Sequence, residues 1–411
     1  MKRGIWLVLA AVAILALTIS GFAQSSDEAA VKGRIVIPPS SQGLVPGRVR
    51  TPLQVIIPDE GPNNPPAGAE NPGSIACVYG VTPPTSGCPL TGAPVATGGS
   101  RAIAVVDYGN NSTLQADFNA FNSEYGLPAQ TLQFICPPSC TPCPSSNGTG
   151  WDLETALDVE YEHAMAPNAQ IFVAQFCNDP IGDGTETMAA AAVAASPYGG
   201  GEVSNSWTYN DGEGWCGSGD CELSYDSYFT TPTVVYFGAA GDSGLGPAYP
   251  SISPNVISAG GTRIRRNNGL FTGEEDCWNG SGGGISIYEP LPNYQLIVGN
   301  RTGPHRGTPD WAADASTSSP VAIYSTTGCG GWCAVGGTSV ASPTLAGITN
   351  AAGSFANHTP SELQKTYNYY KNPGLYRQIF YDVTVGNNGA PAQLGWDECT
   401  GLGTPRKLTG F

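Results

Sequence analysis

A serine at the start of a helical pattern is the first group in this sequence that could do covalent chemistry. Residues 335–346 read VGGTSVASPTLA, in which a Gly-Gly-Thr-Ser turn runs directly into an alanine-rich stretch. Small residues on a tight turn leave a substrate room to approach Ser339, which makes this serine the candidate nucleophile. Its hydroxyl needs a base, and none of the three histidines, His163, His305 and His358, lies in a catalytic sequence context.

Two carboxylates four residues apart offer a different base. Glu154 and Asp158 lie in a predicted helix over 152–166 and therefore share one face of it. Because two adjacent carboxylates resist ionising together, one pKa rises, and the pair can hold one proton and accept another. Such a pair would act as a general base at acidic pH, where histidine is already protonated. The alternative is a solvated acidic face, although the helix has no Lys or Arg to pair with its acids.

A third carboxyl follows an apolar strand pattern. Asp242 lies in the segment AAGDSG, so it should sit at the carboxyl end of that strand. As a protonated acid it could donate a hydrogen bond to a developing oxyanion, and the alternative is an ordinary aspartate in a glycine-rich turn. A trypsin-like interpretation of GDSG would make Ser243 the nucleophile. The chain lacks both an Ala-His-Cys segment and the GGP continuation, which excludes that interpretation.

The elements that would position these groups alternate between strands and helices. Strand patterns cover 101–109, 170–176, 201–207, 231–244 and 255–262, and helical patterns cover 112–126, 152–166, 186–196 and 339–352. This alternation predicts an α/β fold in which a mostly parallel sheet carries helices on both faces, within one large domain over 73–411. Active residues of such sheets gather on loops beyond the strand ends.

The N-terminal part of the chain predicts export. Residues 1–23 combine two basic residues, an apolar run and small residues, as a secretory signal peptide does, and the alternative is an uncleaved anchor. Residues 24–72 form a Pro- and Gly-rich leader whose two short apolar runs, 34–38 and 53–58, could dock as strands on the main domain. We expect a secreted protein, extracellular or periplasmic, that is monomeric and has no membrane segment beyond the signal.

The net charge and the number of cysteines indicate which classes of partner the chain can bind and whether its cysteines are oxidised. The formal net charge of −16 argues against nucleic acid and anionic membranes as partners. The 12 cysteines of an exported chain indicate disulfides, whose pairing the sequence does not give. A zinc cluster at Cys136, Cys140 and Cys143 is the alternative for three of them.

Taken together and in order, the motifs resemble one family. ETALD with HAMAPNA, SNSW, GDSG, SPNV with GGT, SGGGIS, PDWAADA, GGTSVASP, and FYDVTVGNNG with GWDECTGLGTP follow the order of the sedolisins, or serine-carboxyl peptidases. These are relatives of subtilisin whose base is a glutamate, and the resemblance runs from residue 74 to the C-terminus. It implies a subtilisin-like fold and peptide hydrolysis. Asp107 lies in a segment that resembles the one carrying subtilisin's catalytic aspartate, but the His-Gly-Thr segment that subtilisin needs is missing.

The resemblance implies a role for each matching residue. Ser339 would be the nucleophile that forms an acyl-enzyme, and its N–H would donate to the oxyanion. Glu154 would be the general base, with Asp158 behind it holding and sharing the proton. Asp242 would be the oxyanion-hole acid and would work only when protonated. The glycines that would line the cleft around an extended peptide are Gly282, Gly283 and Gly284.

The resemblance also implies one structural Ca²⁺ near the C-terminus. Carboxylates would come from Asp382 and Asp397, and backbone carbonyls from Val383, Gln393 and Gly395. Sedolisins often have glycine where Gln393 stands, but this matters little for a carbonyl ligand. The alternative is two aspartates in ordinary turns.

One departure from the family concerns the leader. Family members usually carry a long folded prodomain, whereas here only residues 24–72 lie between the signal and the resemblance, so the leader is a remnant or the enzyme folds without a prodomain. We expect a secreted, acid-acting endopeptidase that cuts proteins or peptides. The alternatives are a catalytically silent sedolisin-like module that binds peptides or sits at the cell surface, and an exopeptidase that removes tripeptides.

Overall fold

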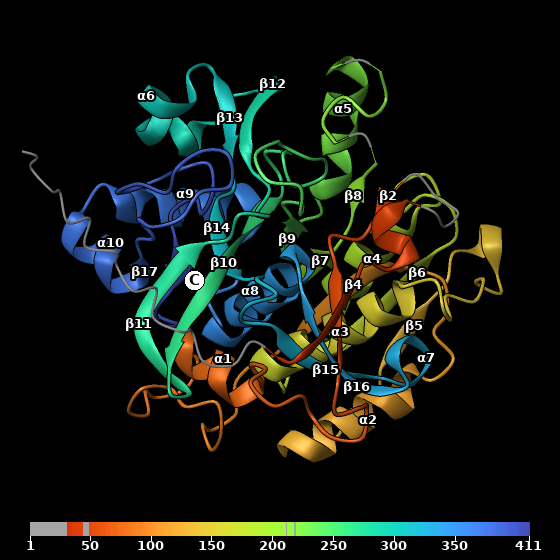
Figure 1. Cartoon of the computed structure of the whole chain (residues 1–411). Coiled ribbons are helices and arrows are strands. Elements are labelled where there is room, and N and C mark those ends of the chain that lie inside the picture. The colour runs from red at the N-terminus through yellow and green to blue at the C-terminus, as the bar shows by residue number, and fades with distance from the viewer. Residues whose placement is uncertain (1–30, 44–48, 211, 218) are drawn as a thin grey trace, which may run out of the picture.

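The computed structural model describes residues 31–43, 49–210, 212–217 and 219–411 (Figure 1). The predicted signal peptide lies outside the described residues. Within the described part of the chain, no helix combines the length and the apolar character needed to cross a membrane.

A large, mostly parallel sheet forms the centre of the molecule (Figure 1). Its strands, in spatial order, are β11 (Leu270–Cys277), β10 (Ile257–Asn267), β9 (Val234–Ala239), β7 (Gly201–Asn205), β4 (Ala102–Tyr108), β6 (Gln170–Phe176) and β5 (Gln133–Ile135), with β14 (Trp311–Asp314) paired to β10. Only the β10–β11 pair is antiparallel among them. The predicted α/β fold with a mostly parallel sheet is therefore confirmed.

Helices cover both faces of this sheet. On one face lie α3 (Trp151–Met165) and α8 (Thr338–Ala352), with α1 (Pro72–Val78) and α2 (Leu114–Tyr125) outside them, and on the other lies α4 (Thr185–Ala194). Near the C-terminus, α9 (Thr359–Tyr370) and α10 (Pro373–Ile379) add to the larger core. Each predicted helix is present within a few residues of its expected bounds.

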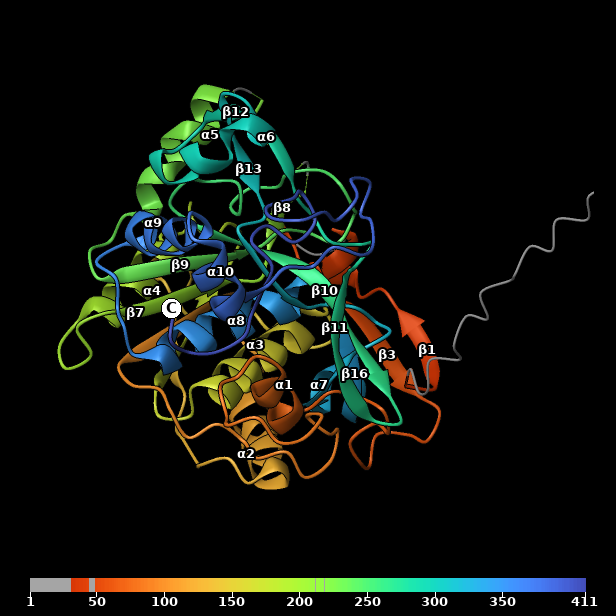
Figure 2. The ribbon, with the colours of Figure 1, turned by 90° about the vertical axis from the view of Figure 1, so that its left-hand side faces the viewer.

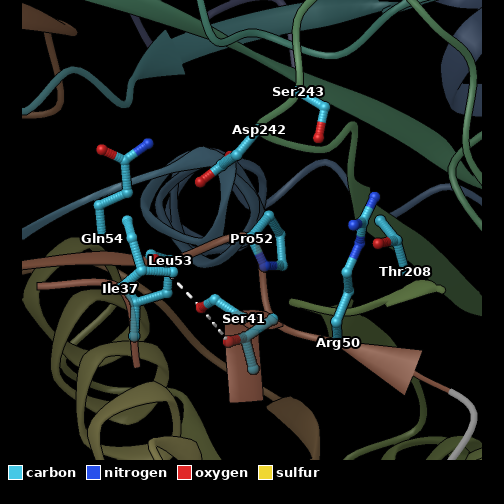
Figure 3. A pocket seen from close by; sticks show the side chains of 10 residues that line it. Ile37, Ser41, Arg50, Pro52, Leu53, Gln54, Thr208, Asp242 and Ser243 are labelled. Atoms are coloured by element: carbon cyan, nitrogen blue, oxygen red, sulfur yellow. Dashed lines mark hydrogen bonds between the residues drawn. The ribbon is translucent and has the colours of Figure 1, made fainter. Parts of the chain in front are cut away.

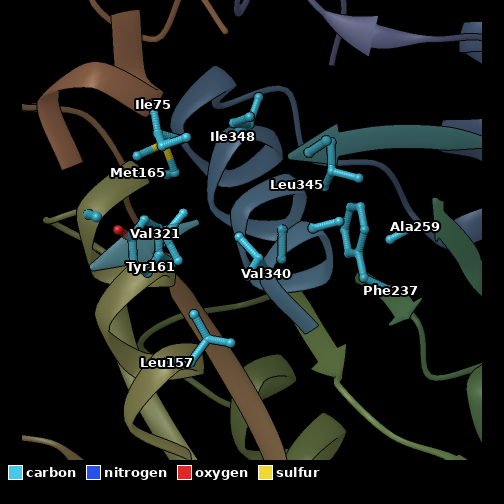
Figure 4. Packing of buried hydrophobic residues seen from close by; sticks show 14 of the residues in the cluster. Ile75, Leu157, Tyr161, Met165, Phe237, Ala259, Val321, Val340, Leu345 and Ile348 are labelled. Atoms are coloured by element: carbon cyan, nitrogen blue, oxygen red, sulfur yellow. The ribbon is translucent and has the colours of Figure 1, made fainter. Parts of the chain in front are cut away.

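The contact between α3 and α8 holds the catalytic candidates in place. Figure 4 shows Val340 and Leu345 of α8 reaching toward Phe237 of β9, with Leu157 of α3 nearby. Gly347 allows the two helices to approach closely, since a Cβ there would lie 2.7 Å from the Cβ of Met165. Burial of apolar side chains is the main favourable term in folding, so the packed contact between α3 and α8 keeps the two helices in one arrangement.

The leader adds strands to the catalytic body (Figure 2). A four-stranded antiparallel sheet has the order β1 (Gly33–Val36), β3 (Gln54–Pro58), β16 (Gly331–Gly336) and β15 (Val321–Ser325). A 3₁₀ turn, η1 (Pro39–Gln42), follows β1, and β2 (Val49–Arg50) pairs antiparallel with β8 (Thr208–Tyr209). Both apolar runs of the leader thus dock as predicted.

All cysteines are paired, so the zinc alternative is wrong. The disulfides are Cys77–Cys88, Cys136–Cys143, Cys140–Cys177, Cys216–Cys221, Cys277–Cys399 and Cys329–Cys333. A cysteine in a disulfide cannot supply the thiolate that zinc requires.

The remaining elements are η2 (Pro138–Cys140), α5 (Gly219–Tyr225), η3 (Asp226–Phe229), β12 (Gly284–Pro290), η4 (Asn293–Val298), α6 (Gly299–Thr302), β13 (His305–Thr308), α7 (Thr326–Cys329), β17 (Phe380–Tyr381) and β18 (Thr404–Pro405).

Candidate active site

The acidic helix α3 is buried along its whole length. The alternative of a solvated acidic face is therefore wrong. Two of its acids serve the fold: Asp152 accepts the N–H groups of the preceding turn, and Glu160 accepts the N–H of Tyr324 in β15. Glu154 and Asp158 share the other face, as their spacing of four predicts.

Asp158 is joined to the nucleophile's helix by a serine that follows β7. The hydroxyl of Ser206 donates to Asp158 Oδ1 at 2.8 Å and lies 3.5 Å from the carbonyl oxygen of Ser339. That carbonyl is available because its ordinary helical partner would be the N–H of Pro343, which proline lacks. The proline inside α8 therefore leaves an acceptor that helps to hold Asp158 beside the site.

Glu154 and Ser339 face each other without an ordinary hydrogen bond. Both side chains are fully buried, and neither the Ser339 Oγ nor either Glu154 carboxylate oxygen has a hydrogen-bond partner within the described residues. The nearby Ser339 hydroxyl nevertheless favours the charged form of Glu154. Catalytic hydrogen bonds are often long before a substrate is bound, so this loose contact suits a nucleophile and its base.

Burial and a third carboxyl set the protonation of the pair. Desolvation, followed by the charge of Asp107 at the end of β4, raises the pKa of Glu154 and of Asp158 well above their ordinary values. Burial also raises the pKa of Asp107 to about 7. Three carboxyls so close in a dry site cannot all be charged, so the cluster keeps protons well above the usual range for acids.

Asp242 is presented at the turn that carries Ser339. Its Oδ1 accepts the N–H of Thr338 at 2.8 Å and the hydroxyl of Thr338 at 3.0 Å, and Oδ2 has no hydrogen-bond partner among the residues that the structure describes. Burial raises the pKa of Asp242 to about 7, partly opposed by the two hydrogen bonds from Thr338. Below that pH, Oδ2 can carry a proton and donate it in a hydrogen bond.

A segment of the leader already occupies the space beside these groups (Figure 3). The carbonyl oxygen of Pro52 accepts the backbone N–H of Ser339 at 3.2 Å. Asp242 and Pro52 line the same pocket in Figure 3, and a Cβ added to Gly337 would collide with both the Pro52 carbonyl oxygen and Asp242 Oδ2. Residue 337 must therefore be glycine, because any side chain there would occupy the space of the Pro52 carbonyl oxygen and of Asp242 Oδ2. Its φ of 124° also favours glycine.

The three glycines expected in the cleft differ in position. Gly282 lines a hollow next to Asp242, on the side of Thr208 and Asn210. The backbone of Gly283 pairs with Gly246, and Gly284 begins β12. Their roles in substrate binding remain predictions.

The residues expected to bind Ca²⁺ do come together. The Gly395 N–H donates to Asp382, and the Gln393 N–H donates to Asp397. No N–H or hydroxyl of the described residues donates to the carbonyls of Val383, Gln393 or Gly395. Two carboxylates and three free carbonyls form a hard-oxygen donor set that fits Ca²⁺.

Two neighbouring carbonyls of the same loop accept hydrogen bonds from Arg301. The guanidinium of Arg301 donates to the carbonyl oxygens of Leu394, at 2.7 Å, and Trp396. In the loop 393–397, Arg301 thus binds the carbonyls of Leu394 and Trp396. It does not bind the carbonyls of Gln393 and Gly395, which are the expected Ca²⁺ ligands.

Comparison with known proteins identifies the family. A model of the subtilase family, Peptidase_S8, matches residues 150–393. The chain belongs to the subtilase family. Its relatives include sedolisin from Pseudomonas sp. (strain 101), which is 26% identical over 350 residues, and this confirms the resemblance found in its motifs.

Kumamolisin from Bacillus sp. (strain MN-32) is 28% identical over 342 residues, which are 75% of this chain and 59% of the relative. Tripeptidyl-peptidase 1 from Dictyostelium discoideum is 27% identical over 352 residues, 75% of this chain and 53% of the relative. The chain thus spans less than two thirds of either relative. A solved structure of Pseudomonas sedolisin, a serine-carboxyl proteinase, matches with a TM-score of 0.66 at 24% identity, covering 83% of this chain and 96% of that one. This match supports the subtilisin-like fold.

Sequence reasoning left two groups of this site without a role. The sequence offers no partner histidine for Asp107, yet the structure places this carboxyl beside Glu154 and Asp158. The sequence feature that could have pointed to Asp107 is its position as an acid at the end of an apolar strand pattern. Ser206 lay within a recognised motif, but nothing local indicates that its hydroxyl reaches Asp158.

Proposed function

We propose that this subtilase is an acid-acting serine-carboxyl endopeptidase. The observation that carries the proposal is an extended peptide segment with its Pro52 carbonyl oxygen on the Ser339 N–H, next to Asp242 Oδ2. A peptidase must hold a carbonyl oxygen between two donors beside an activated hydroxyl. The Pro52 carbonyl oxygen lies on the Ser339 N–H and close to Asp242 Oδ2, which supports such an arrangement.

Each residue has a step in the reaction. Ser339 Oγ attacks the substrate carbonyl carbon while Glu154 takes its proton, and Asp158, held by Ser206, shares the resulting charge and proton. The Ser339 N–H and the protonated Asp242 donate to the oxyanion. Glu154 returns the proton to the leaving amine, and water then hydrolyses the acyl-enzyme by the same route.

This mechanism requires acid. Asp242 donates only when protonated, which its pKa of about 7 allows below neutral pH. The base needs one negative charge on the Glu154–Asp158 pair. Burial and Asp107 keep a second charge off that pair, so the competent state holds one proton.

The path of the leader supports endopeptidase action. Arg50 pairs with Thr208 on one side of Pro52, and Gln54 pairs with Gly336 on the other. A cleft that holds the interior of a chain, rather than only its terminus, suits cleavage within a chain. A tripeptidyl exopeptidase, which relatives of this chain are named for, would instead close the cleft beyond the third residue.

Hydrolysis of a denatured protein between about pH 3 and pH 8 tests the proposal. Cleavage should be confined to acid and fall at least about a thousandfold in Ser339→Ala. Ser342→Ala, one turn further along α8, is the matched control and should stay active. Peptide products of mixed length indicate an endopeptidase, and tripeptides alone would indicate the exopeptidase. No cleavage in acid by a folded protein would favour the silent binding module.

We also propose one structural Ca²⁺ held by Asp382 and Asp397 with the carbonyls of Val383, Gln393 and Gly395. The ion would cross-link the loop 393–397 to the residues after β17. Export to an oxidising compartment is part of the same proposal, and the six disulfides support it.

A further inference from the structure

Two glycine-rich segments meet at the hollow next to Asp242. One is the turn 241–246, of sequence GDSGLG, which carries Asp242 and Ser243 (Figure 3), and the other is the segment 280–284, of sequence GSGGG. Glycines of the turn have positive φ, from 76° at Gly244 to 157° at Gly246. Because glycine leaves a backbone many accessible conformations, contacts with other parts of the protein must fix where the Asp242 carboxyl lies.

The two segments support each other through backbone hydrogen bonds. The Gly282 N–H donates to the Gly241 carbonyl oxygen at 2.7 Å, and the Gly246 N–H donates to the Gly283 carbonyl oxygen at 2.6 Å. These bonds fix the segments relative to one another, but not relative to the catalytic helices. Thr338 supplies one attachment to α8 at the start of the turn, where its Oγ1 accepts the Gly241 N–H at 3.0 Å.

Asn388 attaches both segments at the other end of the turn. Its carbonyl oxygen accepts the Leu245 N–H at 2.7 Å. Its side-chain amide donates to the Ser281 carbonyl oxygen at 2.9 Å and to the Glu398 carbonyl oxygen at 3.0 Å. The residue is 6% exposed, so water competes little for these bonds. One buried residue thus joins the turn, the segment 280–284 and the C-terminal loop.

The C-terminal loop that receives this amide is itself anchored. Cys399, next to Glu398, forms a disulfide with Cys277 at the end of β11. The Cys399 carbonyl oxygen also accepts the Ser281 hydroxyl at 2.9 Å, and that hydroxyl accepts the Gly261 N–H of β10 at 2.8 Å. Asn388 therefore connects the turn to a part of the chain that is fixed on the edge of the central sheet.

An amide side chain matches what this position requires. The Asn388 nitrogen carries two hydrogens, one for each of its two carbonyl partners, and its oxygen accepts the Ala390 N–H at 3.1 Å. A carboxylate there would have no hydrogen to donate to the two carbonyl oxygens. With the side chain held by three partners, the Asn388 backbone carbonyl that accepts the Leu245 N–H is held as well.

We propose that Asn388 is a positioning residue for the oxyanion acid, which holds the turn 241–246 so that Asp242 Oδ2 stays close to the Ser339 N–H. The inference rests on the proposed peptidase function. It gives the GNNG motif at 386–389 a role in the reaction without contact with the substrate. A donor to the oxyanion acts in the transition state, and a displacement of about 1 Å can cost about a hundredfold in rate.

Steady-state hydrolysis at about pH 4 tests the inference, with a fluorogenic peptide whose sequence is taken from a cut site in a denatured protein. Asn387→Ala is the matched control for Asn388→Ala, because Asn387 is the same residue type in the same loop, is exposed, and accepts the Gly389 N–H of its own loop. We expect Asn388→Ala to lower kcat about 30- to 100-fold and to change KM less than about threefold. Asn387→Ala should match the unaltered chain.

A double-mutant cycle tests whether Asn388 acts through Asp242. Asp242→Ala removes the proposed donor, so adding Asn388→Ala to it should lower kcat by less than about a further twofold. The melting temperature of every variant is measured beside its activity. If Asn388→Ala is unfolded at the assay temperature, Asn388→Asp takes its place, because it keeps the shape of the side chain but cannot donate to both carbonyl oxygens.

Three results would overturn the inference while sparing the peptidase function: equal kcat in Asn388→Ala and Asn387→Ala, a loss carried mainly by KM, or a loss of the same size with and without Asp242→Ala. Failure of the unaltered, folded chain to hydrolyse a denatured protein at any pH would reject the proposed function and this inference with it.

Discussion

Replacing Glu202 by glutamine should stabilise this protein at neutral pH more than at acid pH. Glu202 lies in β7 and is fully buried. Its Oε2 accepts a hydrogen bond from the Asn350 amide at 2.7 Å, and its Oε1 has no partner within the described part of the chain. Burial raises its pKa from 4.5 to about 8. The folded protein therefore binds the proton more tightly than the unfolded chain does.

The sign and size of the effect follow from that shift. The pKa of Glu202 is about 8 in the folded protein and 4.5 in the unfolded chain. The contribution of protonated Glu202 to the free energy of unfolding is therefore fully present below pH 4.5 and is lost as the pH rises toward about 8. At pH 7 the loss is about 3 kcal/mol, at 1.36 kcal/mol for each pH unit above the unfolded value. Glutamine does not titrate, so Glu202→Gln should escape this loss.

Urea denaturation at about pH 4 and pH 7, in a Ser339→Ala background that prevents self-digestion, measures the effect. The glutamine amide adds an unpaired buried donor, whose cost is the same at both pH values and cancels in the comparison. The difference between the two variants should grow by about 3 kcal/mol from pH 4 to pH 7. Glu124→Gln on the exposed side of α2 is the control and should change stability little at either pH. Equal effects of Glu202→Gln at both pH values would refute the reasoning.

Three other predictions test the site and its supports. Above its pKa of about 7, Asp242 loses the proton it donates, so kcat/KM should fall about tenfold per pH unit there, and Asp242→Asn should flatten that limb of the pH–rate profile. Chelation by EDTA should lower the melting temperature through the site at Asp382 and Asp397, and Ca²⁺ but not Na⁺ should restore it. Arg306→Met should cost about 3–5 kcal/mol in urea denaturation, because it leaves the carboxylate of Asp310, 2.7 Å away in a fully buried pair, without its partner.

The proposed acid-acting chemistry and the predicted pH dependence of stability have one physical origin. Asp107 and Glu202 are fully buried and Asp242 is half-buried at the edge of a pocket, and burial raises the pKa of each to about 7 or 8. Protonated acids are well tolerated in such a core, whereas carboxylates are not.

Much of this architecture could be predicted from local patterns. The alternation of strands and helices predicted the parallel sheet, and the spacing of Glu154 and Asp158 placed both on one helix face, since helical periodicity is a property of neighbouring residues. The docking of the two leader strands also followed from their short apolar runs. What a local pattern does not report is depth, so the same helix could equally have been read as a solvated acidic face.

The tertiary structure alone decided which groups meet. Whether α3 faces water or α8, whether Asp107 lies beside Glu154, and whether Ser206 reaches Asp158 depend on contacts between segments distant in the chain. The path of Pro52 past Ser339 is set by the register of non-local strand pairs. The sequence by itself determined the elements and the chemistry they could carry. The register and burial that place the leader on the nucleophile arise only when the chain packs, because such pairings are favoured by the whole core and not by any one segment.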